Sequence, residues 1–204
     1  MIHSYYLSHD GELRSNLTTE DLLEIVRASE GLLWVDLDGE PIESCEQVLL
    51  GTFGFHPLAV DDALRQTHIP KVDDWGEYLF LVFYNLQYLT SDELSIRTQE
   101  LDIFLGINYL VTYHNEPVPS IERIRDTCQR DKLSLSKGTA YLLYQILDDM
   151  ITHYMDVVEA VNQDIDLIED QVFTNPEPAI LERIFTLKRT LLHLRRLLVP
   201  QREV

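Results

Sequence analysis

The sequence predicts an α/β (α+β) layer domain followed by a long antiparallel helical hairpin. Short strand-like and helix-like segments alternate through residues 2–130, a pattern typical of a sheet covered by helices. Apolar residues then recur every three or four positions over about 35 residues, which indicates one long helix. A break at 175–178 precedes a second stretch of this periodicity, and a short break between two amphipathic helices implies a hairpin.

Local signals predict the elements of the layer domain in order. Thr18 can cap a helix together with Asp21 three residues on, and Pro57 suits the first turn of a helix because no N–H is needed there. The dipeptide Ile69-Pro70 forces extended backbone. The predicted elements are a strand at 2–7, a helix ending near residue 31, a buried strand at 32–37, a helix at about 43–51, a short helix at 57–64, a strand at 77–89, two strands within 94–114 around a tight turn at 106–108, and a helix at 118–130.

The hairpin separates positive from negative charge. Residues 138–182 contain ten Asp or Glu and no Lys or Arg, whereas 183–202 contain six bases. We expect attraction between the two helices to explain part of this pattern, but several acids must face solvent. We therefore divide the chain into an α/β domain at 1–134 and an amphipathic hairpin at 135–204.

Composition excludes several classes of protein. The net charge of −19, from 35 acids and 16 bases, argues against nucleic-acid binding and favours cations or basic partners. The longest apolar run is about five residues, far below the ~20 needed to cross a bilayer, so we expect a soluble intracellular segment. Cys45 and Cys128 have no metal-ligand spacing and are expected to be reduced thiols.

No catalytic motif is present, so we predict that the chain is not an enzyme. The sequence lacks GxSxG, a P-loop, GxGxxG, HExxH and CxxC. The seven histidines show no zinc-ligand spacing. His56, beside Pro57 at a helix start, is interpreted as a capping or packing residue.

Two adjacent acids, Asp61 and Asp62, lie near the end of the short helix at 57–64. They repel each other and meet the negative end of the helix dipole, so a positive group should compensate them. Arg65 or Lys71 could do so. A hydrated divalent cation is the alternative, because Mg²⁺ prefers carboxylate oxygens and needs only one or two of them. Asp148 and Asp149 form a second pair of this kind, whereas Asp73 and Asp74 are interpreted as solvent-exposed residues that open the next strand.

Six segments together resemble the cytoplasmic part of the CorA family of divalent-cation channels. They occur in the family's order nearly from end to end. The segments are LWVDLDGEP (33–41), FHPLAVDDAL (55–64), PKVDDWGEYLFLVF (70–83), YLVTYHNEPV (109–118), YLLYQILDD (141–149) and LKRTLLHLRRLLVPQREV (187–204). One departure is His68-Ile69, where the family commonly has Gln-Arg before Pro-Lys.

The resemblance implies an αβα sandwich with a mixed sheet, followed by two long helices with an acidic surface. A stalk helix, two membrane spans and a Gly-Met-Asn pore motif follow in the family. None lies in these 204 residues, so we expect a fragment that ends inside the second long helix. The full-length protein would lie in the cell inner membrane with this segment in the cytoplasm.

The resemblance also implies a regulatory site. Family members are homopentamers in which Mg²⁺ between neighbouring cytoplasmic domains keeps the pore closed. The matching positions are Asp62, Asp61 (usually Glu in the family) and Asp148, and the opposing carboxylates belong to the stalk, so each site would be half a site. We therefore expect a cation-sensing domain for Mg²⁺ or Co²⁺, which as an isolated fragment is a monomer or weak dimer. The alternatives are the same domain of a zinc transporter and a stand-alone acidic module that docks a basic protein.

Overall fold

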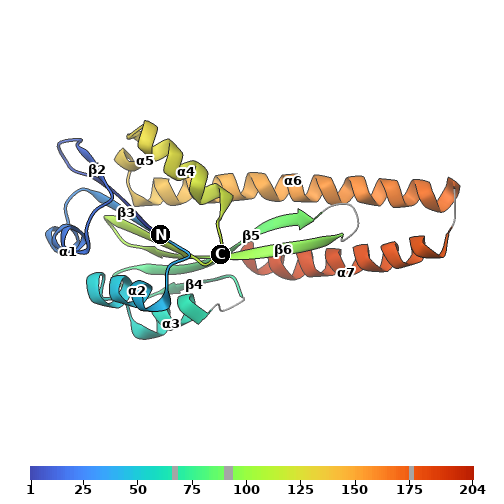
Figure 1. The fold of residues 1–204 in the computed structure, drawn as a ribbon, viewed down its shortest axis with the longest axis horizontal. Coiled ribbons are helices and arrows are strands. Elements are labelled where there is room, and N and C mark those ends of the chain that lie inside the picture. The colour runs from blue at the N-terminus through green and yellow to red at the C-terminus, as the bar shows by residue number, and fades with distance from the viewer. Residues whose placement is uncertain (66–68, 90–93, 175–176) are drawn as a thin grey trace.

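A seven-stranded mixed sheet forms the centre of the computed structural model, which describes residues 1–65, 69–89, 94–174 and 177–204 (Figure 1). The strand order is β2-β1-β3-β7-β6-β5-β4. The β3–β7 pair is parallel and the other pairs are antiparallel. The strands are β1 (Ile2–Leu7), β2 (Leu13–Ser15), β3 (Leu32–Asp38), β4 (Lys71–Asp74), β5 (Leu79–Leu89), β6 (Ser95–Leu105) and β7 (Tyr109–His114).

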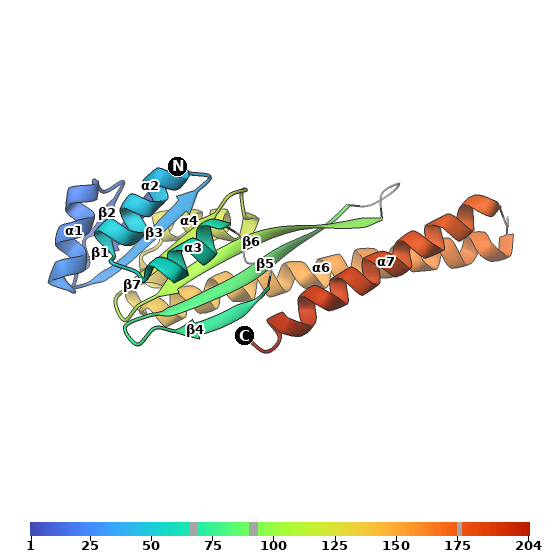
Figure 2. The ribbon, with the colours of Figure 1, turned by 90° about the horizontal axis from the view of Figure 1, so that it is seen from below.

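Helices cover both faces of this sheet, which confirms the predicted sandwich (Figures 1 and 2). One face packs on α1, α2, the π-helix η1 and α3, and the other on α4, α5 and the beginning of α6. Alternate residues of β6 serve the two cores: Phe104 belongs to the first, and Leu101 and Ile103 to the second. The helices are α1 (Thr19–Ala28), α2 (Ile42–Glu46), η1 (Gln47–Thr52), α3 (Pro57–Arg65), α4 (Pro119–Arg130), α5 (Leu133–Ser136), α6 (Thr139–Thr174) and α7 (Pro178–Gln201).

The start and the end of α1 follow from the sequence around it. Thr18 and Asp21 form the predicted capping box, in which each side chain accepts a hydrogen bond from the other's backbone N–H. The helix ends at Ser29, and Gly31 then turns the chain into β3 with φ of +70°. A Cβ atom on Gly31 would lie 2.4 Å from the Leu7 carbonyl oxygen, so this close approach requires glycine.

Four elements differ from the sequence prediction, and one is strand β4, which lies where only extended backbone after Ile69-Pro70 was expected. The helix expected at 43–51 begins as the short α-helix α2 and continues as the π-helix η1. The π-helical turn accommodates one extra residue before the chain reaches Phe53. The three-residue β2 and the four-residue α5 are too short to leave a periodic signal. Cys45 and Cys128 are free and buried, as expected, and burial raises the pKa of their thiols to about 11 and about 12.

The long helices form the predicted antiparallel hairpin, which extends well beyond the sheet (Figure 1). Of the predicted break at 175–178, residues 175 and 176 lie outside the described residues, and α7 begins at Pro178 after its N-cap residue Glu177. The β5–β6 ribbon runs alongside the hairpin (Figure 1) and is tied to it, since the Tyr154 hydroxyl donates to the Tyr84 carbonyl and the Thr190 hydroxyl to the Leu94 carbonyl. The first turns of α6 also pack in the core of the sheet, so the hairpin and the α/β part are joined by extensive contacts. None of the described helices is long and apolar enough to cross a membrane.

Candidate cation-binding site

Helix α3 carries Asp61 and Asp62, and His56 positions its first turn. The His56 Nδ1 atom accepts a hydrogen bond of 3.2 Å from the Leu58 N–H, and its backbone N–H donates to the Tyr78 hydroxyl at 2.9 Å. The imidazole also stacks on Trp75 at 4.4 Å between ring centroids. The interpretation of His56 as a capping and packing residue is therefore confirmed.

Both predicted compensating bases are used, one for each acid. Arg65 Nε lies 2.8 Å from Asp61 Oδ1 one helical turn away, and Lys71 Nζ lies 2.6 Å from Asp62 Oδ2 across the gap between α3 and β4. The Asp61 and Asp62 side chains keep 48% and 40% of their surface exposed. The two carboxylates thus lie at the surface and are reachable by a hydrated ion.

A third acid shares the Lys71 ammonium. Asp73 Oδ2 lies 2.7 Å from Lys71 Nζ, whereas Asp74 Oδ1 accepts a hydrogen bond from the Gly76 N–H. Both aspartates lie within β4 rather than before a strand. The expectation that Asp73 merely faces solvent was wrong, because alternation along β4 places it on the same face as Lys71.

Asp148 and Asp149 differ in their surroundings although they are adjacent on α6. Asp149 accepts three hydrogen bonds from Arg123 at 2.6, 3.0 and 3.1 Å. Partial burial raises the pKa of Asp149, but the bonds from Arg123 outweigh it and the net pKa is lowered. Asp148 is exposed, and its carboxylate accepts only a 3.4 Å contact from the Tyr144 hydroxyl among the described residues. Of the two, Asp148 is therefore the carboxylate left available to a ligand.

The structure does not bring the three predicted site residues together. Asp61 and Asp62 lie on α3, which packs on one core, and Asp148 lies on the part of α6 that packs on the core of the opposite face. The described residues contain no group of three or more His, Cys, Asp or Glu arranged to hold a metal ion. A cation at either place would need water or further ligands in addition to the described residues.

The donor chemistry at α3 fits Mg²⁺. Partly exposed carboxylate oxygens leave room for the waters that Mg²⁺ retains, and one or two carboxylates suffice. Asp61 also lines a cavity of about 380 Å³ between α2 and α3, together with Glu46. Assignment of Asp61, Asp62 and Asp148 to a cation site remains a prediction.

Sequence reasoning missed a buried polar network at the β3–β7 pair. Asp36, fully buried, accepts hydrogen bonds from Thr112 at 2.6 Å and Arg125 at 3.0 Å, and His114 Nε2 lies 3.1 Å away. Burial lowers the pKa of His114, but the nearby Asp36 and Asp38 carboxylates raise it by more, so the pKa of His114 lies above the usual histidine value of 6.5. The alternation of Asp36 and Asp38 in an otherwise apolar strand was the signal that could have revealed this network.

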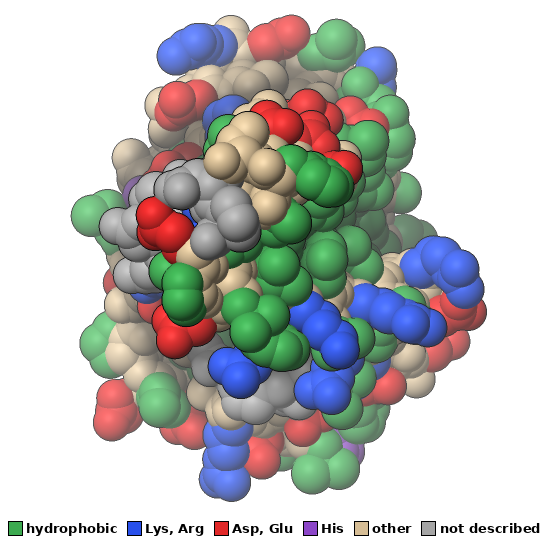
Figure 3. All heavy atoms as spheres, turned by 90° about the vertical axis from the view of Figure 1, so that its right-hand side faces the viewer, with side chains coloured by type: hydrophobic (Ala, Val, Ile, Leu, Met, Phe, Trp, Pro, Cys, Tyr) green, Lys and Arg blue, Asp and Glu red, His purple; other side chains and the backbone are tan. Residues whose placement is uncertain are grey.

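Between the described α6 and α7, no ion pair joins an acid of the first helix to a base of the second. Apolar contacts among Val161, Ile168, Ile180 and Leu187 hold them together instead. Helix α7 carries exposed apolar and basic side chains, which include Leu181, Phe185, Lys188, Leu192, Arg195 and Val199. Side chains of these two kinds lie next to each other on the end of the molecule shown in Figure 3. Contacts between oppositely charged side chains therefore do not explain the charge separation.

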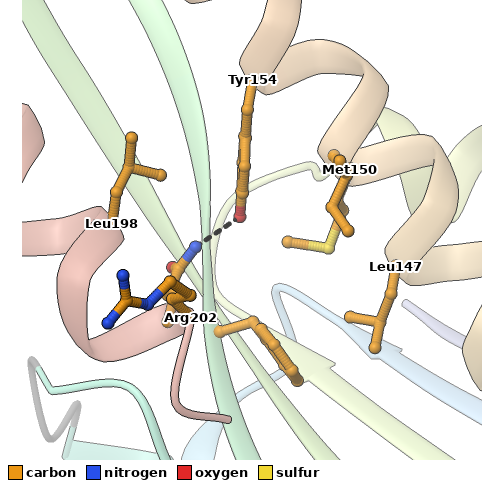
Figure 4. A pocket seen from close by; sticks show the side chains of 8 residues that line it. Leu147, Met150, Tyr154, Leu198 and Arg202 are labelled. Carbon is orange, nitrogen blue, oxygen red and sulfur yellow. Dashed lines mark hydrogen bonds between the residues drawn. The ribbon is translucent and has the colours of Figure 1, made fainter.

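The cavity at the base of the hairpin is apolar and differs in chemistry from the acidic surface. It has a volume of about 230 Å³ between β5, α6 and α7 (Figure 4). Its lining includes Met150, Leu147 and Leu198, and the Gln201 amide donates to the Tyr154 hydroxyl at its edge. No carboxylate lines it, so it is not a candidate cation site.

Residues 29–204 match the family model described as CorA-like Mg²⁺ transporter protein. YfjQ of Bacillus subtilis, named as a proposed metal ion transporter, is 28% identical over all of this chain and 61% of its own length. The cobalt/magnesium transport protein CorA of Thermotoga maritima is 28% identical over 87% of this chain and 51% of its own length. The chain thus spans about half to three fifths of these relatives.

The fold also matches a solved structure. The soluble domain of CorA from Methanocaldococcus jannaschii superposes with a TM-score of 0.77 and 20% identity, covering 100% of this chain and 77% of that one. This likeness concerns the fold and agrees with the mixed sheet and long helices described above.

Proposed function

This chain belongs to the family of CorA-like Mg²⁺ transporter proteins, and from that membership we propose that it is the cytoplasmic regulatory part of a divalent-cation transporter. The family consists of transporters rather than enzymes, in agreement with the absence of catalytic motifs from the sequence. The proposed location is the cytoplasmic side of the cell inner membrane, with the membrane reached through a region outside these 204 residues.

The observation that carries the proposal is the pair of surface carboxylates on α3 within the region that matches the family. Asp61 and Asp62 are exposed enough to meet a second protein surface, and Asp148 is similarly available on α6. Each place supplies only one or two carboxylates, so a bound Mg²⁺ would keep positions open for water or for a second protein surface. Such an incomplete site is what a cation bound between subunits requires.

We propose that Mg²⁺ or Co²⁺ binds between this surface and carboxylates of a neighbouring copy in a homopentamer. Opposed carboxylates repel each other, and a bridging cation reverses the sign of that interaction. Cation binding then stabilises the tightly packed assembly, and loss of the cation loosens it. Retained hydration keeps the affinity low, which suits the sensing of an abundant ion.

The central test is Asp62→Asn in the full-length protein. Asparagine keeps the shape of the side chain and removes the charge, so Mg²⁺-dependent closure should require several-fold more Mg²⁺. Asp126→Asn, which changes an exposed acid on α4, is the matched control. Gating identical to wild type in the Asp62 variant would remove this residue from the site.

A calorimetric titration with Mg²⁺, Co²⁺ and Zn²⁺ tests the choice of ion. We expect Mg²⁺ and Co²⁺ to bind with similar weak affinity, since carboxylates and water are hard ligands. Clear selectivity for Zn²⁺ would favour the zinc-transporter alternative instead.

A further inference from the structure

Lys71 contacts an oxygen atom of Asp62, one of the proposed cation ligands. Its ammonium contacts Asp62 Oδ2 at 2.6 Å and Asp73 Oδ2 at 2.7 Å, so one positive charge bridges two carboxylates from different elements. A divalent cation on Asp62 would lie within a few ångströms of this ammonium. Because the two cations repel each other and compete for the same oxygens, they exclude one another.

The two contacts of Lys71 are not equivalent. Lys71 and Asp73 alternate on one short strand, β4, whereas Asp62 lies on a separate helix. Lys71 can therefore release Asp62 and keep Asp73 without any change in the backbone of β4. Its Nζ atom also lies 5.2 Å from the centroid of the Phe80 ring, which keeps the ammonium near the sheet.

The sheet beneath Lys71 carries one further carboxyl group, that of Asp102. Lys71 pairs in register with Val82 of β5, and Val82 pairs with Asp102 of β6, so the three side chains share one face of the sheet. Asp102 is 1% exposed, and its Oδ1 atom has no hydrogen-bond partner among the described residues. An ammonium displaced from Asp62 thus stays beside acids rather than entering an apolar environment.

We propose that Lys71 is a built-in competitor that holds Asp62 when divalent cation is scarce, and that cation binding at Asp62 proceeds by exchange with Lys71. The proposal rests on the cation site proposed above and assigns to Lys71 the role of setting its affinity. Lys71 thereby raises the cation concentration at which the site fills. Arg65 acts on Asp61 much more weakly, because its side chain is 80% exposed and the pair is screened by solvent.

The test measures binding of Mn²⁺, a probe for the site, to the full-length protein in 150 mM salt by electron paramagnetic resonance of free Mn²⁺. Lys71→Gln should bind Mn²⁺ about tenfold more tightly than wild type, the change expected for removing a partly buried ion pair. Lys71→Arg keeps the charge and should stay within about threefold of wild type. The matched control Arg65→Gln should also stay within about threefold. Adding Asp62→Asn to Lys71→Gln should abolish the gain.

Two failures can be told apart. If Asp62→Asn weakens Mn²⁺ binding but Lys71→Gln leaves it at the wild-type value, the role of Lys71 is refuted and the cation site stands. If Asp62→Asn has no effect in either background, the cation site itself is refuted. Circular dichroism checks that each variant is folded, and Lys71→Met, which retains packing on Phe80, replaces Lys71→Gln if that variant unfolds.

Discussion

Asp102→Asn should stabilise the protein, and the gain should grow with pH. Asp102 lies in the middle of the sheet with 1% of its surface exposed, and burial raises the pKa of its carboxyl well above 3.8, with Glu100 and Asp62 adding to the rise and Lys71 opposing it. Below pH 3.8 the carboxyl is protonated in both the folded and the unfolded chain, so its titration does not lower the free energy of unfolding there.

The magnitude follows from proton linkage. Between pH 3.8 and the raised pKa, the unfolded chain ionises while the folded chain keeps the proton, so stability falls by about 1.4 kcal/mol for each pH unit. Asparagine does not titrate and removes this loss. The free energy of unfolding of Asp102→Asn minus that of wild type should therefore rise with pH at up to this slope and then level off above the raised pKa.

Urea denaturation at half-unit steps from pH 4.5 to 8 measures this difference, with the fluorescence of the fully buried Trp34 as one probe of unfolding. Asp10→Asn, which changes an exposed acid in the turn after β1, is the control and should show no comparable slope. A difference for Asp102→Asn that is constant over the whole pH range would refute the assignment of a buried neutral acid.

Two further variants test the fold. Gly31→Ala should lower the free energy of unfolding, measured by urea denaturation, by about 2 kcal/mol or more, because strain at positive φ adds to a contact of 2.4 Å with the Leu7 carbonyl oxygen. Gly11→Ala is the control: its φ is similar but no atom lies close to the new Cβ, so it should lose only about 1 kcal/mol. Equal losses would contradict the role of the close approach. His114→Gln should lower the free energy of unfolding, because the charged imidazole lies between Asp36 and Asp38. This loss should shrink as pH rises from 6.5 through the raised pKa of His114, since the imidazole of the wild-type protein then loses its proton. A difference that stays constant over that range would show that His114 is neutral in the folded protein.

The sequence predicted those parts of the fold that local signals control. The capping box of Thr18 and Asp21, the start of α3 at Pro57 and the length of α6 each depend on residues close together in the chain. Strand β2 and helix α5 escaped prediction because tertiary contacts maintain them: β2 pairs with β1, and Leu135 of α5 fills the second core. The π-helix η1 was also invisible, since its apolar pattern also fits an α-helix.

For the candidate site, the sequence identified the acids and the two bases that could compensate them, but it could not divide the bases between the acids. The packing of β4 against α3 decided that Lys71 meets Asp62, and strand alternation decided that Asp73 joins them. Asp102 drew no attention in the sequence, because one acid in a strand-like segment is unremarkable until both neighbouring strands and the covering layer bury it.

The sequence by itself thus determined the longer elements of secondary structure, the excess of acids and membership of the family, because periodicity, capping and motif order depend on neighbouring residues. The tertiary structure alone decided which charges meet. Ion pairs such as Lys71–Asp62 and His114–Asp36 join residues 9 and 78 positions apart, and their energies depend on distance and burial, which exist only after the layers have packed.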